Sequence, residues 1–92
     1  MTMPAARRPL RLLYFAWLRE RAGIGEEVVA LPEGVANVAA LLDWLRARGP
    51  GFAAAFAPGL PVRCAVNQDF AGPETPVAPG DEVAFFPPVT GG

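Results

Sequence analysis

The feature that most constrains the fold is the C-terminal stretch of residues 82–92, in which a short apolar run meets two prolines and ends in two glycines. Residues 83–86 have the composition of a β-strand. Pro87 and Pro88 must end this strand, because proline has no N–H to donate to a sheet ladder and pushes the residue before it toward an extended conformation. The stretch therefore predicts a final strand that continues as a stiff spacer.

The terminal pair Gly91–Gly92 has a functional and an ordinary explanation. Only bare backbone passes through a narrow channel, so a tail that presents its terminal carboxylate inside a partner gains from having no side chains. A frayed terminus or a remnant of cloning is the ordinary explanation, and two glycines end a chain by chance about once in 200 times. The Pro-Pro spacer directly after a strand favours the functional explanation.

The reactive side chains argue against an enzyme that works alone. The chain has no His, Lys or Ser, which removes the commonest general base, the Schiff-base amine and the serine nucleophile. Metal sites built on imidazole are excluded as well. The single cysteine, Cys64, lies in an apolar run where a buried, inert thiol is expected. The sequence therefore predicts no metal site and no cofactor bound by this chain.

Length and charge narrow the class of protein further. The 92 residues, 52% of them hydrophobic, make one domain with a small core. Residues 10–18 resemble the apolar part of a secretion signal, but Arg11 interrupts them and residues 19–21 are charged where small residues belong. The net charge is −1 and the N-terminal arginines lack interleaved aromatic residues. We expect a cytoplasmic protein that binds neither a membrane nor nucleic acid.

The periodicity of the apolar residues predicts four strands. Residues 10–18 are apolar on both faces, which indicates a central strand or one whose second face meets a partner. A glycine-containing turn at 23–25 leads to a second strand at 26–31, so the two strands are predicted to form a hairpin. Residues 62–66 are a third strand and residues 83–86 the last.

One main helix is predicted between these strands. Asn37 can cap it, and apolar residues follow at helical spacing at Val38, Leu41, Leu42 and Leu45. Gly49 and Pro50 are expected to end it. The remaining segments are predicted as loops: residues 51–61 with one poor helical turn, 67–69 as a turn followed by Phe70, and 72–79.

This order of elements predicts an α+β fold, a mixed sheet with one main helix packed on one face. The helical crossover allows the first and last strands to lie side by side and parallel. We divide the chain into a disordered leader at residues 1–9, a domain at 10–86 and an extended functional tail at 87–92.

With its Gly-Gly tail, this order resembles that of the ubiquitin-like β-grasp proteins. Within that group, residues 10–92 resemble the small, sulfur-carrier subunits of molybdopterin synthase. The most specific match is Gly-Asp-Glu-Val-Ala-Phe-Phe-Pro-Pro-Val-Thr-Gly-Gly at residues 80–92, followed by Ala-Val-Asn-Gln at 65–68. A looser match is Leu-Tyr-Phe-Ala at 13–16 with Arg-Glu at 19–20. The leader, and Asn37 where threonine is familiar, depart from the family pattern.

The resemblance implies that the function depends on Gly92. A ubiquitin-activating-like adenylyltransferase is expected to join its carboxylate to AMP from ATP, because a free carboxylate is a poor electrophile. Sulfur from a persulfide enzyme then replaces AMP and leaves a C-terminal thiocarboxylate. The tail, formed by Pro87, Pro88, Val89, Thr90 and Gly91, is expected to thread into the large synthase subunit and deliver the sulfur of Gly92 to precursor Z.

The resemblance also implies a two-plus-two heterotetramer, in which the catalytic side chains belong to the large subunit and this chain is not catalytic alone. The apolar docking patch of the family falls on Phe15, Phe70 and Phe86, for which core positions are the alternative. Two rival functions share part of this pattern. One is a carrier or ubiquitin-like modifier of another pathway, such as thiamine synthesis or tRNA thiolation, and the other is a plain interaction domain with an inert tail.

Overall fold

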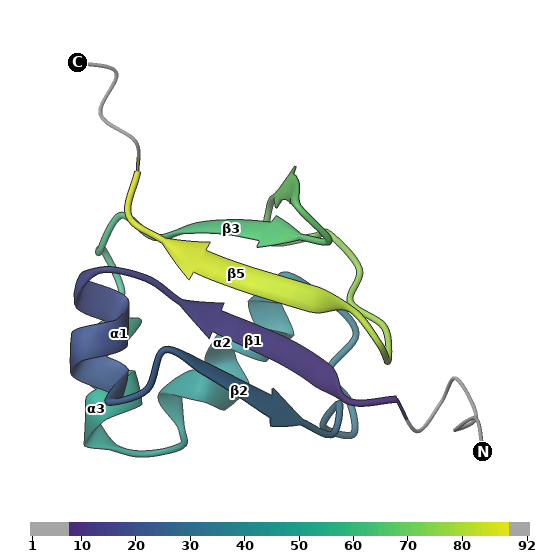
Figure 1. The fold of residues 1–92 in the computed structure, drawn as a ribbon, viewed down its shortest axis with the longest axis horizontal. Coiled ribbons are helices and arrows are strands. Elements are labelled where there is room, and N and C mark those ends of the chain that lie inside the picture. Colours follow the sequence, from purple (N-terminus) through teal and green to yellow (C-terminus); the bar gives the residue numbers. More distant parts are fainter. Residues whose placement is uncertain (1–7, 89–92) are drawn as a thin grey trace.

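The computed structural model describes residues 8–88 and consists of a mixed sheet with helices packed against it (Figure 1). The predictions for the leader and for Val89, Thr90, Gly91 and Gly92 concern positions that lie wholly or largely outside these residues. The elements in chain order are β1 (Leu10–Tyr14), α1 (Trp17–Ala22), β2 (Glu26–Val29), α2 (Val38–Arg46), α3 (Pro50–Ala55), β3 (Arg63–Val66), β4 (Asp69–Ala71) and β5 (Glu82–Phe86).

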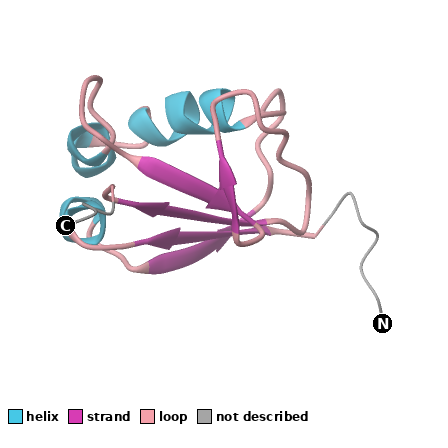
Figure 2. Ribbon diagram, turned by 90° about the horizontal axis from the view of Figure 1, so that it is seen from above, coloured by secondary structure: helices cyan, strands magenta, loops and turns pink. Residues whose placement is uncertain are grey.

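The five strands lie in the order β2-β1-β5-β3-β4. β1 and β5 are parallel, and the other neighbouring pairs are antiparallel. The central position of the first strand and its parallel pairing with the last are therefore confirmed. α2 crosses one face of the sheet, and α1 and α3 lie together at the end where β1 and β5 finish (Figures 1 and 2). This is the α+β, ubiquitin-like β-grasp arrangement that the sequence predicts.

The first strand is shorter than predicted. β1 ends at Tyr14, and the chain turns at Ala16, whose φ of 55° and ψ of −132° end the extended backbone. The following residues form α1, which buries Leu18 and exposes residues 19–21. The prediction of one strand through Leu18 is thus wrong, because apolar residues on both faces of a strand pattern also fit a short helix. β1 and β2 do pair as an antiparallel hairpin, but a helix connects them.

The main helix is confirmed, and its end is corrected. The Asn37 side chain accepts a hydrogen bond from the backbone N–H of Ala40 at 2.9 Å, as a helix cap does. The helix buries Val38, Leu41 and Leu45 against the sheet. It ends at Arg46, and Pro50 then begins a further helix, α3, instead of ending the first. Proline suits the first helical position, where its missing N–H has no partner in any case.

Close packing explains why α3 forms in a segment that was predicted to be mostly loop. A Cβ added at Gly51 would lie 2.5 Å from the backbone oxygen of Arg21, so the glycine lets α3 approach α1 directly. β4 was also not predicted. Asn67 and Gln68 both have positive φ, 51° and 71°, and form the two-residue turn of a tight hairpin between β3 and β4. Residues 72–79 form a loop, as predicted.

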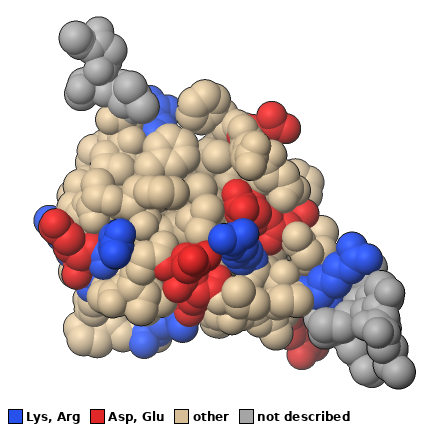
Figure 3. Space-filling model, in the orientation of Figure 1, with Lys and Arg blue, Asp and Glu red and all other residues tan. Residues whose placement is uncertain are grey.

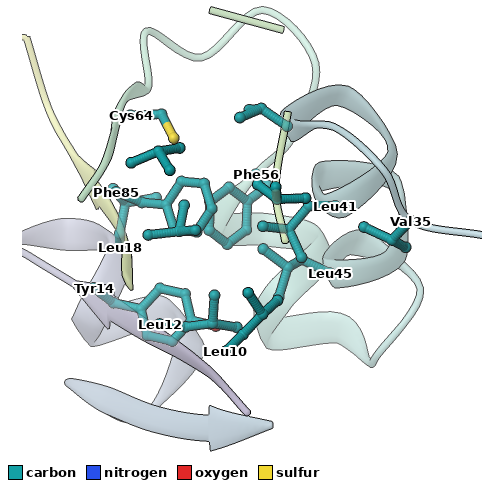
Figure 4. Close-up of a cluster of buried hydrophobic side chains, with 14 of the residues drawn as sticks. Leu10, Leu12, Tyr14, Leu18, Val35, Leu41, Leu45, Phe56, Cys64 and Phe85 are labelled. Carbon is teal, nitrogen blue, oxygen red and sulfur yellow. The ribbon is translucent and has the colours of Figure 1, made fainter. Parts of the chain in front are cut away.

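An aromatic cluster lies at the centre of the core (Figure 4). The ring of Tyr14 stacks on Phe85 with centroids 6.0 Å apart, and Phe56 meets Phe85 edge-on at 5.0 Å. The Tyr14 hydroxyl donates to Glu27 Oε2 at 2.7 Å, and Arg48 donates to the same oxygen. Because its polar tip is paired, the tyrosine is buried without loss of a hydrogen bond. This network joins β1, β2 and the end of α2.

Candidate functional site

The candidate site is the face of the sheet opposite α2, which we call the open face. Alternation along the strands decides which residues lie there. In β5, Val83 and Phe85 are buried in the core, and Glu82, Ala84 and Phe86 occupy the open face. The other strand residues of the open face are Arg11 and Leu13 in β1, Glu26 and Val28 in β2, Arg63 and Ala65 in β3, and Phe70 in β4, which is paired with Ala65.

The three phenylalanines of the predicted docking patch lie outside the core. Phe70 is 84% exposed and Phe15 is 48% exposed, and Phe86 is partly buried. The rings of Phe70 and Phe86 are 6.1 Å apart and tilted to one another. Phe15 donates its backbone N–H to the carbonyl of Phe85 at 3.1 Å, which brings it to the end of β5. Three residues distant in the sequence thus gather around the point where β5 ends.

The point where β5 ends is also the base of the tail. Pro87 and Pro88 follow Phe86 as partly buried residues outside the sheet ladder, and the tail positions beyond them are outside the described residues. Arg63 is the ladder partner of Phe86, so β3 contributes a basic residue at the same place. Arg63, Phe70 and Phe86 line a hollow of about 320 Å³ together with Cys64 and Ala71. The prediction from sequence did not single out Arg63.

Charge is distributed unevenly over the open face. Figure 3 shows acidic and basic side chains along β1, β2 and the start of β5, and a largely uncharged area over β3 and the second half of β5. On the charged side, the Arg11 guanidinium forms an ion pair with Glu26, at 3.0 Å between nitrogen and Oε2, and a longer one with Glu82 Oε2 at 3.8 Å. The apolar part of the open face is therefore the part next to the tail, as expected for a surface that binds another protein.

The described residues offer little chemistry of their own. Burial raises the pKa of the Cys64 thiol to about 11, so the residue is protonated at neutral pH and is a weak nucleophile. Burial and the hydrogen bond to Glu27 raise the pKa of the Tyr14 phenol far above its ordinary value. Residues 8–88 contain no cluster of side chains suited to a metal ion. Nor does that part of the chain form a helix long and apolar enough to cross a membrane.

Comparisons with known proteins agree with this arrangement. Residues 12–92 match the ThiS family. The molybdopterin synthase sulfur carrier subunit of Haemophilus influenzae is 39% identical over 83 residues, which cover 90% of this chain and 99% of that protein. A solved structure of a putative molybdopterin converting factor, subunit 1 from Pyrococcus furiosus, has a TM-score of 0.72 at 31% identity and covers 89% of this chain and 99% of its own.

A second solved structure belongs to small archaeal modifier protein 1 of Haloferax volcanii. Its TM-score is 0.68 at 28% identity, and the match covers 89% of this chain and 99% of that one. A mixed sheet grasping one main helix, with the last strand leading into a C-terminal tail, defines the ubiquitin-like β-grasp class. The chain belongs to the ThiS family, resembles in sequence a relative named as a sulfur carrier subunit, and shares its fold with the Pyrococcus furiosus protein. The family resemblance found in the sequence is confirmed.

Proposed function

We propose that this chain is the sulfur-carrier subunit of a molybdopterin synthase and acts in the cytoplasm. The observation that carries the proposal is the meeting of the apolar part of the open face with the base of a Gly-Gly tail. A protein that delivers its own C-terminus needs a surface that seats the partner and a tail that reaches past that surface. The surface is supplied by Phe15, Phe70 and Phe86, which lie around the start of the tail. The scarcity of reactive side chains leaves catalysis to the partner.

The proposed chemistry takes place on Gly92. Its carboxylate oxygen attacks the α-phosphorus of ATP on an activating enzyme of the ubiquitin-activating kind, which forms an acyl-adenylate and releases pyrophosphate. A sulfur atom from a persulfide enzyme then attacks the acyl carbon, and AMP leaves. Reduction of the resulting acyl disulfide by a thiol frees the thiocarboxylate. The terminal sulfur is then a nucleophile that needs no low-pKa cysteine in this chain.

In the next step the tail enters the active site of the large synthase subunit and gives its sulfur to precursor Z. The product is a dithiolene with two sulfur atoms, so two carriers act for each pterin, which fits a two-plus-two heterotetramer. Pro87 and Pro88 restrict the backbone where the tail leaves the sheet, and so reduce the entropy lost when the tail is ordered in a channel. Val89, Thr90 and Gly91 occupy the channel in this proposal.

The first experiment is mass spectrometry of the tail. Protein isolated from its native host is cut after Glu82, and the peptide of residues 83–92 is weighed. Sulfur in place of oxygen adds nearly the mass of one oxygen atom, but this peptide has no Met, Cys or Trp to be oxidised. We expect the increment on Gly92. A carboxylate that stays unmodified after addition of the activating enzyme, ATP and a sulfur donor would contradict the proposal.

The second experiment tests the docking surface. Phe86→Arg places a charge on the open face beside the tail, and we expect the fold to remain and binding to the large subunit to weaken by at least about 10-fold. Ala53→Arg is the control, since Ala53 is exposed on α3, outside the sheet strands that form the open face. Loss of the native circular dichroism spectrum in Phe86→Arg would place this residue in the core and contradict the assignment.

A carrier or modifier of another pathway is the second candidate, and the likeness to small archaeal modifier protein 1 favours it over an inert domain. This function uses the same activation of Gly92 and differs in the acceptor. Incubation of the thiocarboxylate form with precursor Z and the large subunit distinguishes the two, because only a molybdopterin synthase carrier forms the dithiolene. Deletion of Gly92 tests the interaction-domain alternative, in which the function survives the deletion.

A further inference from the structure

Arg63 is a basic residue placed at the base of the tail. It begins β3, and its partner in the β3–β5 ladder is Phe86, the last residue of β5 before the two prolines. The residue is exposed, and its side chain borders the hollow of about 320 Å³ whose other walls include Phe70, Ala71 and Phe86. We call these four residues the Arg63 socket.

Arg63 differs from three other arginines of the chain in its charged contacts. Arg11, Arg46 and Arg48 each form an ion pair with a carboxylate. Within residues 8–88, Arg63 forms no ion pair. Its neighbours on the open face are Ala65 and Phe86, and both are apolar. Among the described residues, a cation is thus held against a hollow with mainly apolar walls and without a carboxylate paired to it.

Because Arg63 lies beside the base of the tail, a partner that binds the tail also covers the Arg63 side chain. The residues that leave the sheet after Phe86 start beside Arg63, so any channel that receives them has its mouth against this side chain. Removing a guanidinium from water is unfavourable unless the partner supplies hydrogen bonds and an opposite charge. A partner with an apolar side chain for the hollow and a carboxylate for Arg63 satisfies both parts of the socket.

We propose that the Arg63 socket receives an acidic side chain adjacent to an apolar one on the large synthase subunit, and that this pair helps to select the partner. The inference rests on the proposed function, because it takes the large subunit as the protein that binds the tail. The apolar contact contributes to affinity, and the charge excludes surfaces that would leave the guanidinium buried and unpaired.

The test is binding of the carrier to the large subunit from the same host by isothermal titration calorimetry at low and at high salt. We expect Arg63→Gln to weaken binding on the order of 10-fold, the effect of losing one charge pair, and Arg63→Glu to weaken it further. Arg63→Lys keeps the charge and should retain most of the affinity. The difference between wild type and Arg63→Gln should shrink at high salt, because ions screen the pair.

Arg21→Gln is the matched control, because it removes the same charge from α1, away from the open face. Thermal unfolding of each variant shows whether the fold is retained, and little change is expected for an exposed residue. If Arg63→Gln binds the large subunit with the same affinity and the same salt dependence as the wild type, the inference is overturned and the proposed function stands. Absence of binding by the wild type itself would overturn the proposed function, and the inference with it.

Discussion

Adjacent phenylalanines in β5 provide a direct test of which face of the sheet is the core. Phe85 is fully buried and contacts the rings of Tyr14 and Phe56, whereas Phe86 is partly buried on the open face. The two residues share the residue type, the strand and the secondary-structure propensity. Phe85→Ala and Phe86→Ala are therefore matched variants that differ mainly in the environment of the deleted ring.

The expected difference in stability is large. Truncating a buried phenylalanine costs about 3–5 kcal/mol, because apolar contacts are lost and a cavity remains. A domain of this size has a free energy of unfolding of about 5–15 kcal/mol, so Phe85→Ala removes a third or more of it in most of that range. Phe86→Ala loses its contact with Phe70, for which about 0.5–1.5 kcal/mol is expected of an aromatic pair.

The measurement is urea unfolding followed by circular dichroism. With an m value of about 2 kcal/mol per molar urea, Phe85→Ala should lower the midpoint by roughly 2 M, and Phe86→Ala by well under 1 M. Equal losses in the two variants, or a larger loss in Phe86→Ala, would refute the assignment of the faces and the docking surface built on it. A lowered m value in Phe85→Ala would indicate that the variant no longer unfolds in a single two-state transition.

Three further predictions concern the core and its supports. Burial by itself would raise the pKa of Glu27. The hydrogen bonds that its carboxylate accepts, above all from Arg48, outweigh this effect, so the pKa is lowered overall. The contribution of Glu27 to the free energy of unfolding is fully present above the unfolded-state pKa of about 4.3 and is lost as the pH falls through the lower folded-state pKa. The stabilities of wild type and Glu27→Gln should therefore converge in acid. Gly51→Ala should lower the melting temperature by several degrees, because the new Cβ meets the Arg21 carbonyl. Cys64 should react with a thiol reagent at pH 8 roughly 100-fold more slowly in the native than in the unfolded protein, measured by absorbance.

Several elements could be predicted from local sequence because local chemistry decides them. Asn37 caps a helix with its own side chain, and the apolar residues after it recur on one side of that helix. Two prolines must end the strand before them, whatever the rest of the chain does. The family resemblance likewise rests on continuous stretches, above all residues 80–92. These features place the final strand, the main helix and the tail without knowledge of long-range contacts.

The errors fall where tertiary contacts compete with local preference. Residues 10–18 are apolar throughout, so the pattern alone fits a long strand, and only packing turns the chain at Ala16 and buries Leu18 from a helix. α3 contains two residues that commonly end helices, Pro50 and Gly51. Because α3 docks closely against α1, a glycine is required at position 51 despite its low helix propensity.

The sequence by itself determined the tail, its stiff base and the residue types available for chemistry, since these depend only on covalent structure and short-range sterics. The tertiary structure decided which phenylalanines face outward and which residue lies beside the tail. Phe85 and Phe86 are indistinguishable by composition, and pairing with the neighbouring strands separates them into core and surface. Arg63 becomes part of the site only through its register with Phe86, because register is a long-range property set by the burial of a whole sheet face.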